Sequence, residues 1–72
     1  MPYATNEDLP LPLRAHLPPH AQDIYRSAFN GAWITYRDRS PKAREEIAHR
    51  VAWAAVKHKY RKHGDQWVAT GP

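Results

Sequence analysis

The sequence predicts a small, mainly all-α domain organised around one long helix in its second half. Three observations lead to this prediction: a helical stretch with clear start and stop signals follows residue 40, a second apolar helical pattern precedes it, and prolines limit the first 18 residues to short turns. With 72 residues, the chain is expected to form a single domain, 1–72. Leu, Ile, Val and Phe number only 11, so eight aromatic residues and eleven alanines must supply much of the core.

Residues 1–18 are predicted to form a Pro/Leu-rich strap with short helical turns. Leu9, Leu11 and Leu13 alternate with prolines, which constrain the backbone and interrupt helices. We expect the leucines to hold the strap against the helices. A proline-rich recognition ligand is the functional alternative for this segment.

A first long helix is predicted over 19–37, because Pro19 suits an initial helical position and apolar residues recur at helical spacing from Ile24 onward. Gly31 lies inside this helix, where glycine costs about 1 kcal/mol relative to alanine. That cost predicts close packing of another backbone at Gly31. Ile34 falls on the polar side and is expected to be a single exposed hydrophobic residue.

The central helix is predicted over 41–63, with Ser40 as its cap, Pro41 as its first residue and Gly64 closing its last turn. Its apolar arc covers most of its circumference, so we expect neighbours on several sides and a fully buried Trp53. Tyr25 on the preceding helix is expected to be the second large buried ring.

A short strand is predicted over 65–69, because Trp67 and Val68 favour strands. We expect this strand to pair with Pro2–Ala4 and so to join the two ends of the chain in a minimal two-stranded sheet.

The sequence carries no recognisable catalytic or metal-binding motif. It has no cysteine, and the one glutamate-rich run before His49 lacks the second histidine of a zinc-protease motif. The other histidines do not share a regular helical face, and no glycine-rich nucleophile turn or phosphate loop is present. We therefore predict no catalytic residue, no metal and no cofactor, and a protein that is not an enzyme.

Basic residues gather in one part of the chain: from Arg37 to His63 there are nine lysines and arginines against three acids. Such a segment fits an acidic protein face, nucleic acid or anionic lipid, or simply keeps a helix surface solvated. The candidate residues for contact with a partner or nucleic acid are Arg37, Arg39, Lys42, Arg44, Arg50, Lys57 and Arg61. Since no series of stacking aromatics accompanies them, any nucleic-acid binding is expected to be weak and largely independent of sequence.

No apolar run approaches the length of a membrane span, the longest being Val51–Val56, and the N-terminus lacks the apolar core of a signal peptide. We expect a cytoplasmic monomer.

Two segments resemble the signatures of the ChaB family. The first is Leu17–Tyr25 with Ala28–Asn30 and Ala32–Trp33, and the second runs from Glu45 to His58 with Tyr60. Smaller matches are Met1-Pro2-Tyr3, Asp8-Leu9-Pro10 and Trp67. The resemblance covers nearly the whole chain. It implies a compact domain of three helices, similar to part of a cyclin box, with a very small sheet joining the N- and C-termini.

The resemblance also implies a function: regulation of a cation/proton antiporter, through contact with a protein partner. DNA binding, described for viral relatives, is the alternative. Some family members carry a long acidic loop between the two main helices, with affinity for divalent cations. Here the matching segment, Arg37–Arg44, is short and basic. Because hard cations need several oxygen ligands, we expect no specific Ca²⁺ or Mg²⁺ binding.

Overall fold

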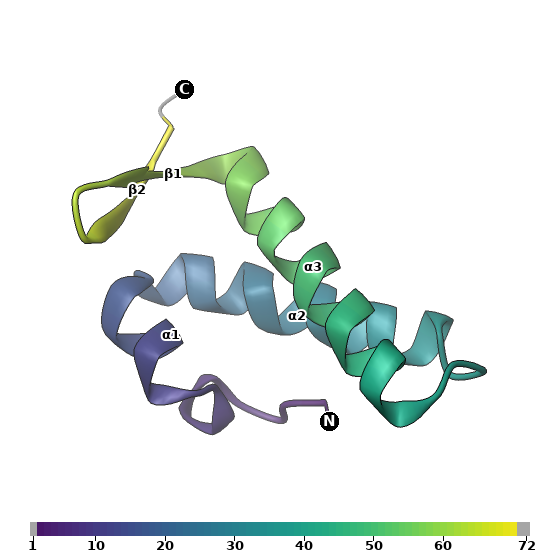
Figure 1. Ribbon diagram of the computed structural model, residues 1–72. Helices are drawn as coiled ribbons and strands as arrows, with labels where there is room; N and C mark the ends of the chain where they lie inside the picture. The colour runs from purple at the N-terminus through teal and green to yellow at the C-terminus, as the bar shows by residue number, and fades with distance from the viewer. Residues whose placement is uncertain (1, 71–72) are drawn as a thin grey trace.

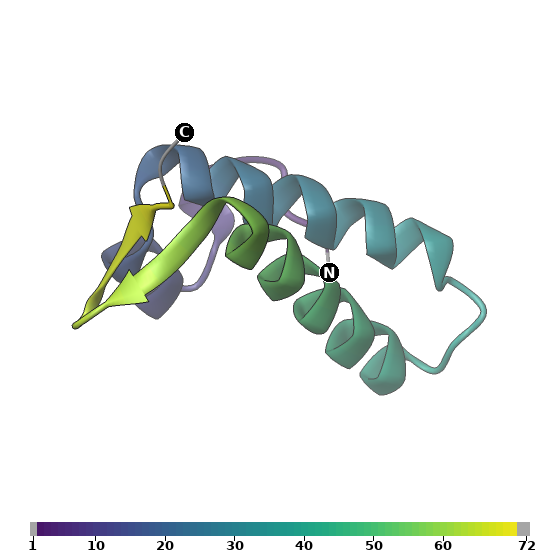
Figure 2. The ribbon, with the colours of Figure 1, turned by 90° about the horizontal axis from the view of Figure 1, so that it is seen from above.

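The computed structural model describes residues 2–70, in which two long helices cross, with a strap at one end of the chain and a hairpin at the other (Figure 1). The elements in chain order are the 3₁₀ turn η1 (Asn6–Asp8), α1 (Leu11–His16), α2 (Pro19–Thr35), α3 (Pro41–Lys59), β1 (Tyr60–His63) and β2 (Gln66–Ala69). The predicted fold class, mainly helical with three helices and one two-stranded sheet, is confirmed. Seen from above, the hairpin extends from the end of α3 over α1 (Figure 2), where its turn contacts His16.

The start of α3 is as predicted. Ser40 Oγ accepts a hydrogen bond from the backbone N–H of Ala43 at 3.3 Å, and Pro41 is the first helical residue. The predicted end is wrong, because α3 stops at Lys59 and Tyr60–His63 form a strand. Tyr60 has extended backbone angles and is only 8% exposed, and its hydroxyl lies 3.2 Å from His20 Nδ1 on α2. Pairing with β2 and burial of Tyr60 therefore stabilise this segment more than one further turn of α3 would.

The predicted pairing of the C-terminal strand with Pro2–Ala4 is also wrong. β2 pairs antiparallel with β1, so the sheet is a local hairpin and does not join the two ends of the chain. Gly64 has the expected positive φ, 62°, but it lies in the hairpin turn and does not close a helix. The backbone of Tyr3 is held by a side chain instead: its N–H donates to Asn30 Oδ1, and Asn30 Nδ2 donates to its carbonyl oxygen, each at 2.8 Å.

The core is a row of buried side chains on each long helix at spacings of three and four residues. These are Ala21, Tyr25, Phe29 and Ala32 on α2, and Ala48, Ala52 and Val56 on α3. Small alanines on α3 give the aromatic rings of α2 room to pack. Tyr25 is buried as predicted.

The expectation that α3 is surrounded on several sides is wrong. Val51 and Ala54 are exposed, and Trp53 is half-buried rather than fully buried. The buried residues of α3 form one narrow row, so Trp53 lies at the edge of the core.

The strap is held both by leucines and by polar side chains of α2. Leu9 and Leu17 are buried as the strap prediction requires, whereas Leu11 is exposed. Arg26 Nε donates to Asn6 Oδ1 at 2.8 Å, a contact that hydrophobic periodicity does not indicate.

Helix α2 begins at Pro19 as predicted but ends at Thr35, two residues earlier than expected. The close approach predicted at Gly31 is wrong: a Cβ at this exposed position would meet nothing within 4 Å. Ile34 is exposed, as predicted.

Two substitutions on α2 test the assignment of the core. Phe29→Ala removes a ring that is 1% exposed and is expected to cost about 3–5 kcal/mol, a large share of the roughly 4–11 kcal/mol that stabilises a domain of this size. Ile34→Ala, five residues later and exposed, is expected to change stability by less than about 0.5 kcal/mol. Urea unfolding followed by circular dichroism measures both changes in the free energy of unfolding. Equal losses of stability would show that α2 faces the core with a different side from the one described.

Replacing each of the two glycines within residues 2–70 by alanine is expected to change the stability of the fold in opposite directions. Gly31→Ala places a good helix former in an open helical position and is expected to add about 0.5–1 kcal/mol, raising the melting temperature by roughly 2–8 °C. Gly64→Ala forces a side chain into the left-handed region and is expected to cost about 1–2 kcal/mol. Calorimetry of the two variants provides the check. If Gly31→Ala instead lowered stability, another part of the backbone would have to pack closely against Gly31, contrary to the structure.

Candidate partner-binding groove

Three adjoining hollows surround Trp53, with volumes of ≈ 560, ≈ 490 and ≈ 730 Å³. The first lies between α1, α3 and the hairpin, the second lies along α3 alone, and the third lies between the strap, α2 and the first half of α3. Trp53 lines all three, and each pair of hollows shares at least one further residue, so together they form a continuous groove. We call it the Trp53 groove. Its floor includes Leu13, Trp53 and Trp67, and charged side chains from α3 and the hairpin form its rim.

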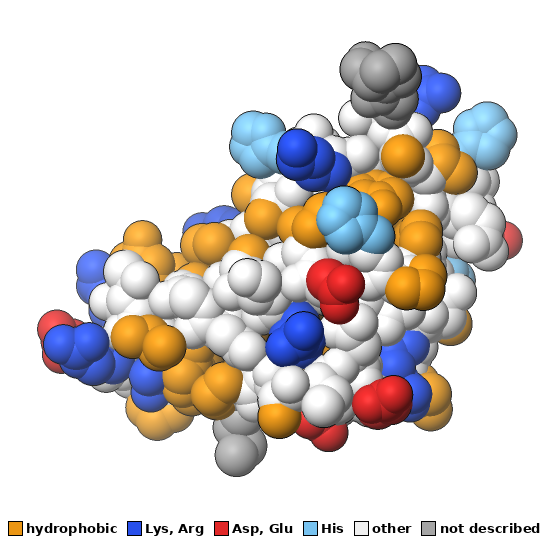
Figure 3. Space-filling model, turned by 180° about the vertical axis from the view of Figure 1, so that it is seen from behind, with side chains coloured by type: hydrophobic (Ala, Val, Ile, Leu, Met, Phe, Trp, Pro, Cys, Tyr) orange, Lys and Arg blue, Asp and Glu red, His pale blue; other side chains and the backbone are white. Residues whose placement is uncertain are grey.

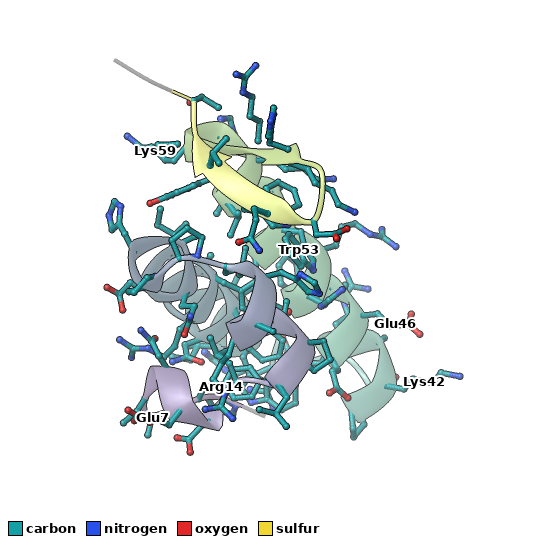
Figure 4. The ribbon with its side chains drawn as sticks, turned by 90° about the vertical axis from the view of Figure 1, so that its left-hand side faces the viewer. Glu7, Arg14, Lys42, Glu46, Trp53 and Lys59 are labelled. Carbon is teal, nitrogen blue, oxygen red and sulfur yellow. The ribbon has the colours of Figure 1, made fainter. Side chains whose placement is uncertain are left out.

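Trp53 reaches this position because it follows buried Ala52 on α3, at the margin of the buried row. One side of its ring packs edge-on against Tyr25, with centroids 5.5 Å apart. The ring also contacts that of Trp67 on β2, with the two ring centroids 5.2 Å apart. Trp53 therefore lies directly below the hairpin, as Figure 4 shows.

The hairpin register decides which basic residues belong to the groove. Lys62 lies opposite Trp67 in the antiparallel pair, so both side chains occupy the face that meets Trp53. Arg61 lies opposite Val68 and therefore on the other face. Because Arg61 is in a strand, it does not continue the face of α3 that carries Arg50 and Lys57.

The rim carries charges of both signs at both ends: Lys42 lines the same hollow as Glu45 and Glu46, and Asp65 lines the same hollow as Lys57 and Lys62. Glu45 and Glu46 stand near the start of α3, whereas Lys57 stands in its last turn and Lys62 on the adjoining strand. Lys42 and Glu46 project outward from the first half of α3 (Figure 4). The full set of charged lining residues comprises four cations and three carboxylates: Lys42, Arg50, Lys57, Lys62, Glu45, Glu46 and Asp65.

The structure separates the seven basic residues chosen from the sequence. Lys42, Arg50 and Lys57 line the groove, whereas the candidates that line none of the three hollows are Arg37, Arg39, Arg44 and Arg61. Lys62 was missed, and only the strand register would have identified it.

Arg44 is engaged in a contact within the protein. Its Nε donates to the carbonyl oxygen of Trp33 at 2.6 Å, and its guanidinium carbon lies 4.1 Å from the centre of the Trp33 ring. This cation–π contact fixes the start of α3 on the end of α2.

Tyr25 and His49 line the same hollow and form a polar contact with each other. The Tyr25 hydroxyl and His49 Nδ1 are hydrogen-bonded at 2.6 Å. Burial raises the pKa of Tyr25 above the usual value of 10.0, and the neighbouring Tyr3 and Glu45 add to the shift. The neutral hydroxyl is thus favoured in the folded state; this stabilisation is complete below pH 10 and is lost in stronger alkali.

Two other histidines connect elements. His16 Nδ1 on α1 donates to the carbonyl oxygen of Asp65 in the hairpin turn at 2.9 Å, and His20 meets Tyr60 as described above. Between residues 2 and 70, no three His, Asp or Glu side chains gather as a metal site would require. No helix in the described part of the chain is long and apolar enough to cross a membrane.

Known proteins have sequences similar to this chain. The chain is 54% identical over 72 residues to the Escherichia coli (strain K12) protein named "Putative cation transport regulator ChaB", with 93% of this chain and 95% of that protein covered. The protein of the same name from Shigella flexneri is equally similar, at 54% identity.

A solved structure entitled "NMR solution structure of the putative cation transport regulator ChaB" aligns with a TM-score of 0.87 and 52% sequence identity. The alignment covers 97% of this chain and 100% of that one. The family model described as ChaB matches residues 9–70. The chain therefore belongs to the ChaB family.

Proposed function

We propose that this protein is a non-enzymatic regulator of a cation/proton antiporter, and that it acts by holding a protein partner in the Trp53 groove. The observation that carries the proposal is the position of Trp53 and Trp67: both are half-buried on the floor of a groove whose rim is charged. Tryptophan is among the residues most enriched where protein interfaces gain their binding energy. The names of the relatives support a regulatory role in cation transport.

The physical reason lies in the surface that the two tryptophans leave in water. Burial of apolar surface is worth roughly 25 cal/mol per Å², so a partner that covers these rings gains free energy. The charged rim would then fix the orientation of the partner, as electrostatic complementarity does at other interfaces.

The role of the groove's titratable groups supports a binding function over catalysis. Tyr25 is neutral and hydrogen-bonded to His49, and His16 is bonded to the hairpin backbone. These contacts connect α2 to α3 and α1 to the hairpin. These proton-bearing side chains therefore hold the fold together.

Nucleic-acid binding is the alternative, supported by the three basic residues at and near the hairpin end, Arg50, Lys57 and Lys62. Three carboxylates share the same rim and would repel phosphates. The face turned away from the viewer in Figure 1 also shows acidic, basic and hydrophobic side chains interspersed (Figure 3). A polyanion would find no long, purely basic path on either surface.

Adjacent residues of β2 provide a matched test of the regulatory proposal. Purified protein, added to everted membrane vesicles that contain the host's cation/proton antiporter, is expected to change the rate of cation-driven proton exchange, measured with a pH-sensitive dye. Trp67→Ala removes part of the groove floor and is expected to abolish most of this effect. Val68→Ala, on the opposite face of the hairpin, is expected to retain it.

Melting curves of both variants establish that they fold. If the unaltered protein leaves exchange unchanged, the proposed function is wrong. Equal losses in the two variants would place the contact outside the groove.

The alternative is tested with a labelled DNA duplex and fluorescence anisotropy. At physiological salt we expect no saturable binding, because the rim carries mixed charge. Saturable binding with a log–log salt slope of roughly −3 to −4.5, as three to five phosphate contacts require, would favour nucleic acid as the partner. Its loss on changing Arg50, Lys57 and Arg61 together to Glu would assign that binding to the basic residues selected from the sequence.

A further inference from the structure

We propose that residues 2–8, the first part of the strap, occupy a peptide-binding site on α2, and that an extended segment of another protein takes this site when they leave it. We call residues 2–8 the N-terminal arm, and the three α2 residues that hold it, Arg26, Phe29 and Asn30, the arm site. The segment that replaces the arm must supply an aromatic side chain. This inference is independent of the antiport function proposed above and is tested without a transporter.

The first argument is that the arm site recognises peptide backbone. Asn30 Oδ1 accepts a hydrogen bond from the N–H of Tyr3, and Asn30 Nδ2 donates to the carbonyl oxygen of the same residue, each at 2.8 Å. Arg26 donates from Nη1 to the carbonyl oxygen of Ala4 at 3.3 Å and from Nε to Asn6 Oδ1 at 2.8 Å. A residue in an antiparallel sheet exchanges the same pair of backbone bonds with its neighbour. Asn30 therefore holds Tyr3 through groups that most extended segments possess.

The second argument is that the arm site selects an aromatic side chain at this position. The ring of Tyr3 lies against that of Phe29, with centroids 4.9 Å apart. Tyr3 also lines the third hollow together with Glu45 of α3. Burial raises the pKa of the Tyr3 hydroxyl, and the charge of Glu45 adds to the shift. The ring thus lies close to both long helices, where a large apolar side chain gains more than a small one.

The third argument is that the arm can leave while the core stays folded. None of residues 2–8 is buried, and the next residue along the chain, Leu9, is the first that is. The turn η1 has bonds of its own, because the N–H and Oγ1 of Thr5 both donate to Asp8 Oδ2. Segments with few buried contacts open at a lower free energy than the whole domain. The arm therefore resembles a ligand that is tied to its site by the rest of the strap.

The arm site tolerates being empty. Arg26 keeps Asp23 as its ion-pair partner on α2, with 3.9 Å between the charged atoms, and both side chains are partly exposed. Asn30 would meet water once the arm has left, so no polar group would be buried without a partner. The main cost is the apolar surface of Phe29 that Tyr3 no longer covers. A segment that places another aromatic ring there removes this cost.

These contacts favour an extended protein segment over a nucleic acid or a helix. A nucleic acid has no backbone N–H to donate to Asn30 Oδ1. In a helix, the backbone N–H groups beyond the first turn are already bonded within the helix. An extended segment leaves both groups of its aromatic residue free to bond with Asn30, as the arm does at Tyr3.

Binding of a synthetic peptide tests the arm site. The probe is a fluorescein-labelled peptide with the sequence of residues 2–8, and its binding to the full chain is measured by fluorescence anisotropy. In the unaltered protein the arm competes with the peptide: if the site is open in about 1% of molecules, the apparent affinity falls about a hundredfold. Tyr3→Gly loosens the arm without changing α2. We expect this variant to bind the peptide at least tenfold more tightly than the unaltered protein does.

Further changes in the Tyr3→Gly protein show which contacts hold the peptide. Asn30→Ala removes both backbone contacts and is expected to weaken binding about tenfold or more. Ser27→Ala, the matched control at an exposed position of the same helix, is expected to leave binding unchanged. A peptide with glycine in place of its tyrosine is expected to bind at least tenfold more weakly. Melting curves establish that each variant folds.

Hydrogen exchange of the unaltered protein tests whether the arm opens by itself. After correction for intrinsic rates, the N–H of Tyr3, which Asn30 holds, is expected to exchange at least tenfold faster than that of Phe29 in the core. Equal rates would overturn the inference, because the arm would then leave only when the whole domain unfolds.

The absence of saturable peptide binding to the Tyr3→Gly protein would also overturn the inference, as would equal binding of the glycine peptide. Dimers of the unaltered protein that Asn30→Ala dissociates would show that a second copy of this chain, and not another protein, supplies the segment. If the peptide binds as expected but antiport is unaffected by the protein, the arm site stands and the regulatory function is wrong. If antiport changes while the peptide does not bind, the regulatory function stands and the arm site is wrong.

Discussion

The packing of Tyr25 between the two long helices is the interaction on which the rest of the structure depends. Its ring is 1% exposed, stacks on Phe29 of its own helix, and meets Trp53 of α3 edge-on. Its hydroxyl is bonded to His49, one helical turn before Trp53. Because the polar end of this ring has a partner, the ring can be buried at little cost. The contact sets the rotation of α3 against α2, and hence the direction in which every other side chain of α3 projects.

The groove is a consequence of that rotation. Alanines and Val56 occupy the buried row of α3, so its one tryptophan is left at the margin, where the hairpin adds Trp67. A chain with few aliphatic residues thus uses its aromatic rings in two ways: Tyr25 and Phe29 fill the core, and the tryptophans of α3 and β2 line a surface. Charges of both signs remain on the exposed side of α3, where they border these rings.

Local signals predicted the helix starts, whereas the features that needed long-range contacts were missed. Gly64 was correctly assigned a positive φ, but both a helix end and a hairpin turn use that conformation, so Tyr60–His63 was assigned to the helix. The place of Lys62 in the groove depends on strand register, and a helical reading cannot supply it. Arg44 appeared to be an available cation because its attachment to Trp33, eleven residues earlier, leaves no pattern in the sequence.

The three tryptophans allow a direct test of the claim that the Trp53 groove is the surface that meets the partner. Hydroxyl-radical footprinting compares the purified protein with the protein bound to host membranes that contain the antiporter. We predict that oxidation of Trp53 and Trp67 falls on binding, while Trp33, which Arg44 covers outside the groove, is unchanged. Protection of Trp33 with unchanged oxidation of Trp53 and Trp67 would contradict the account.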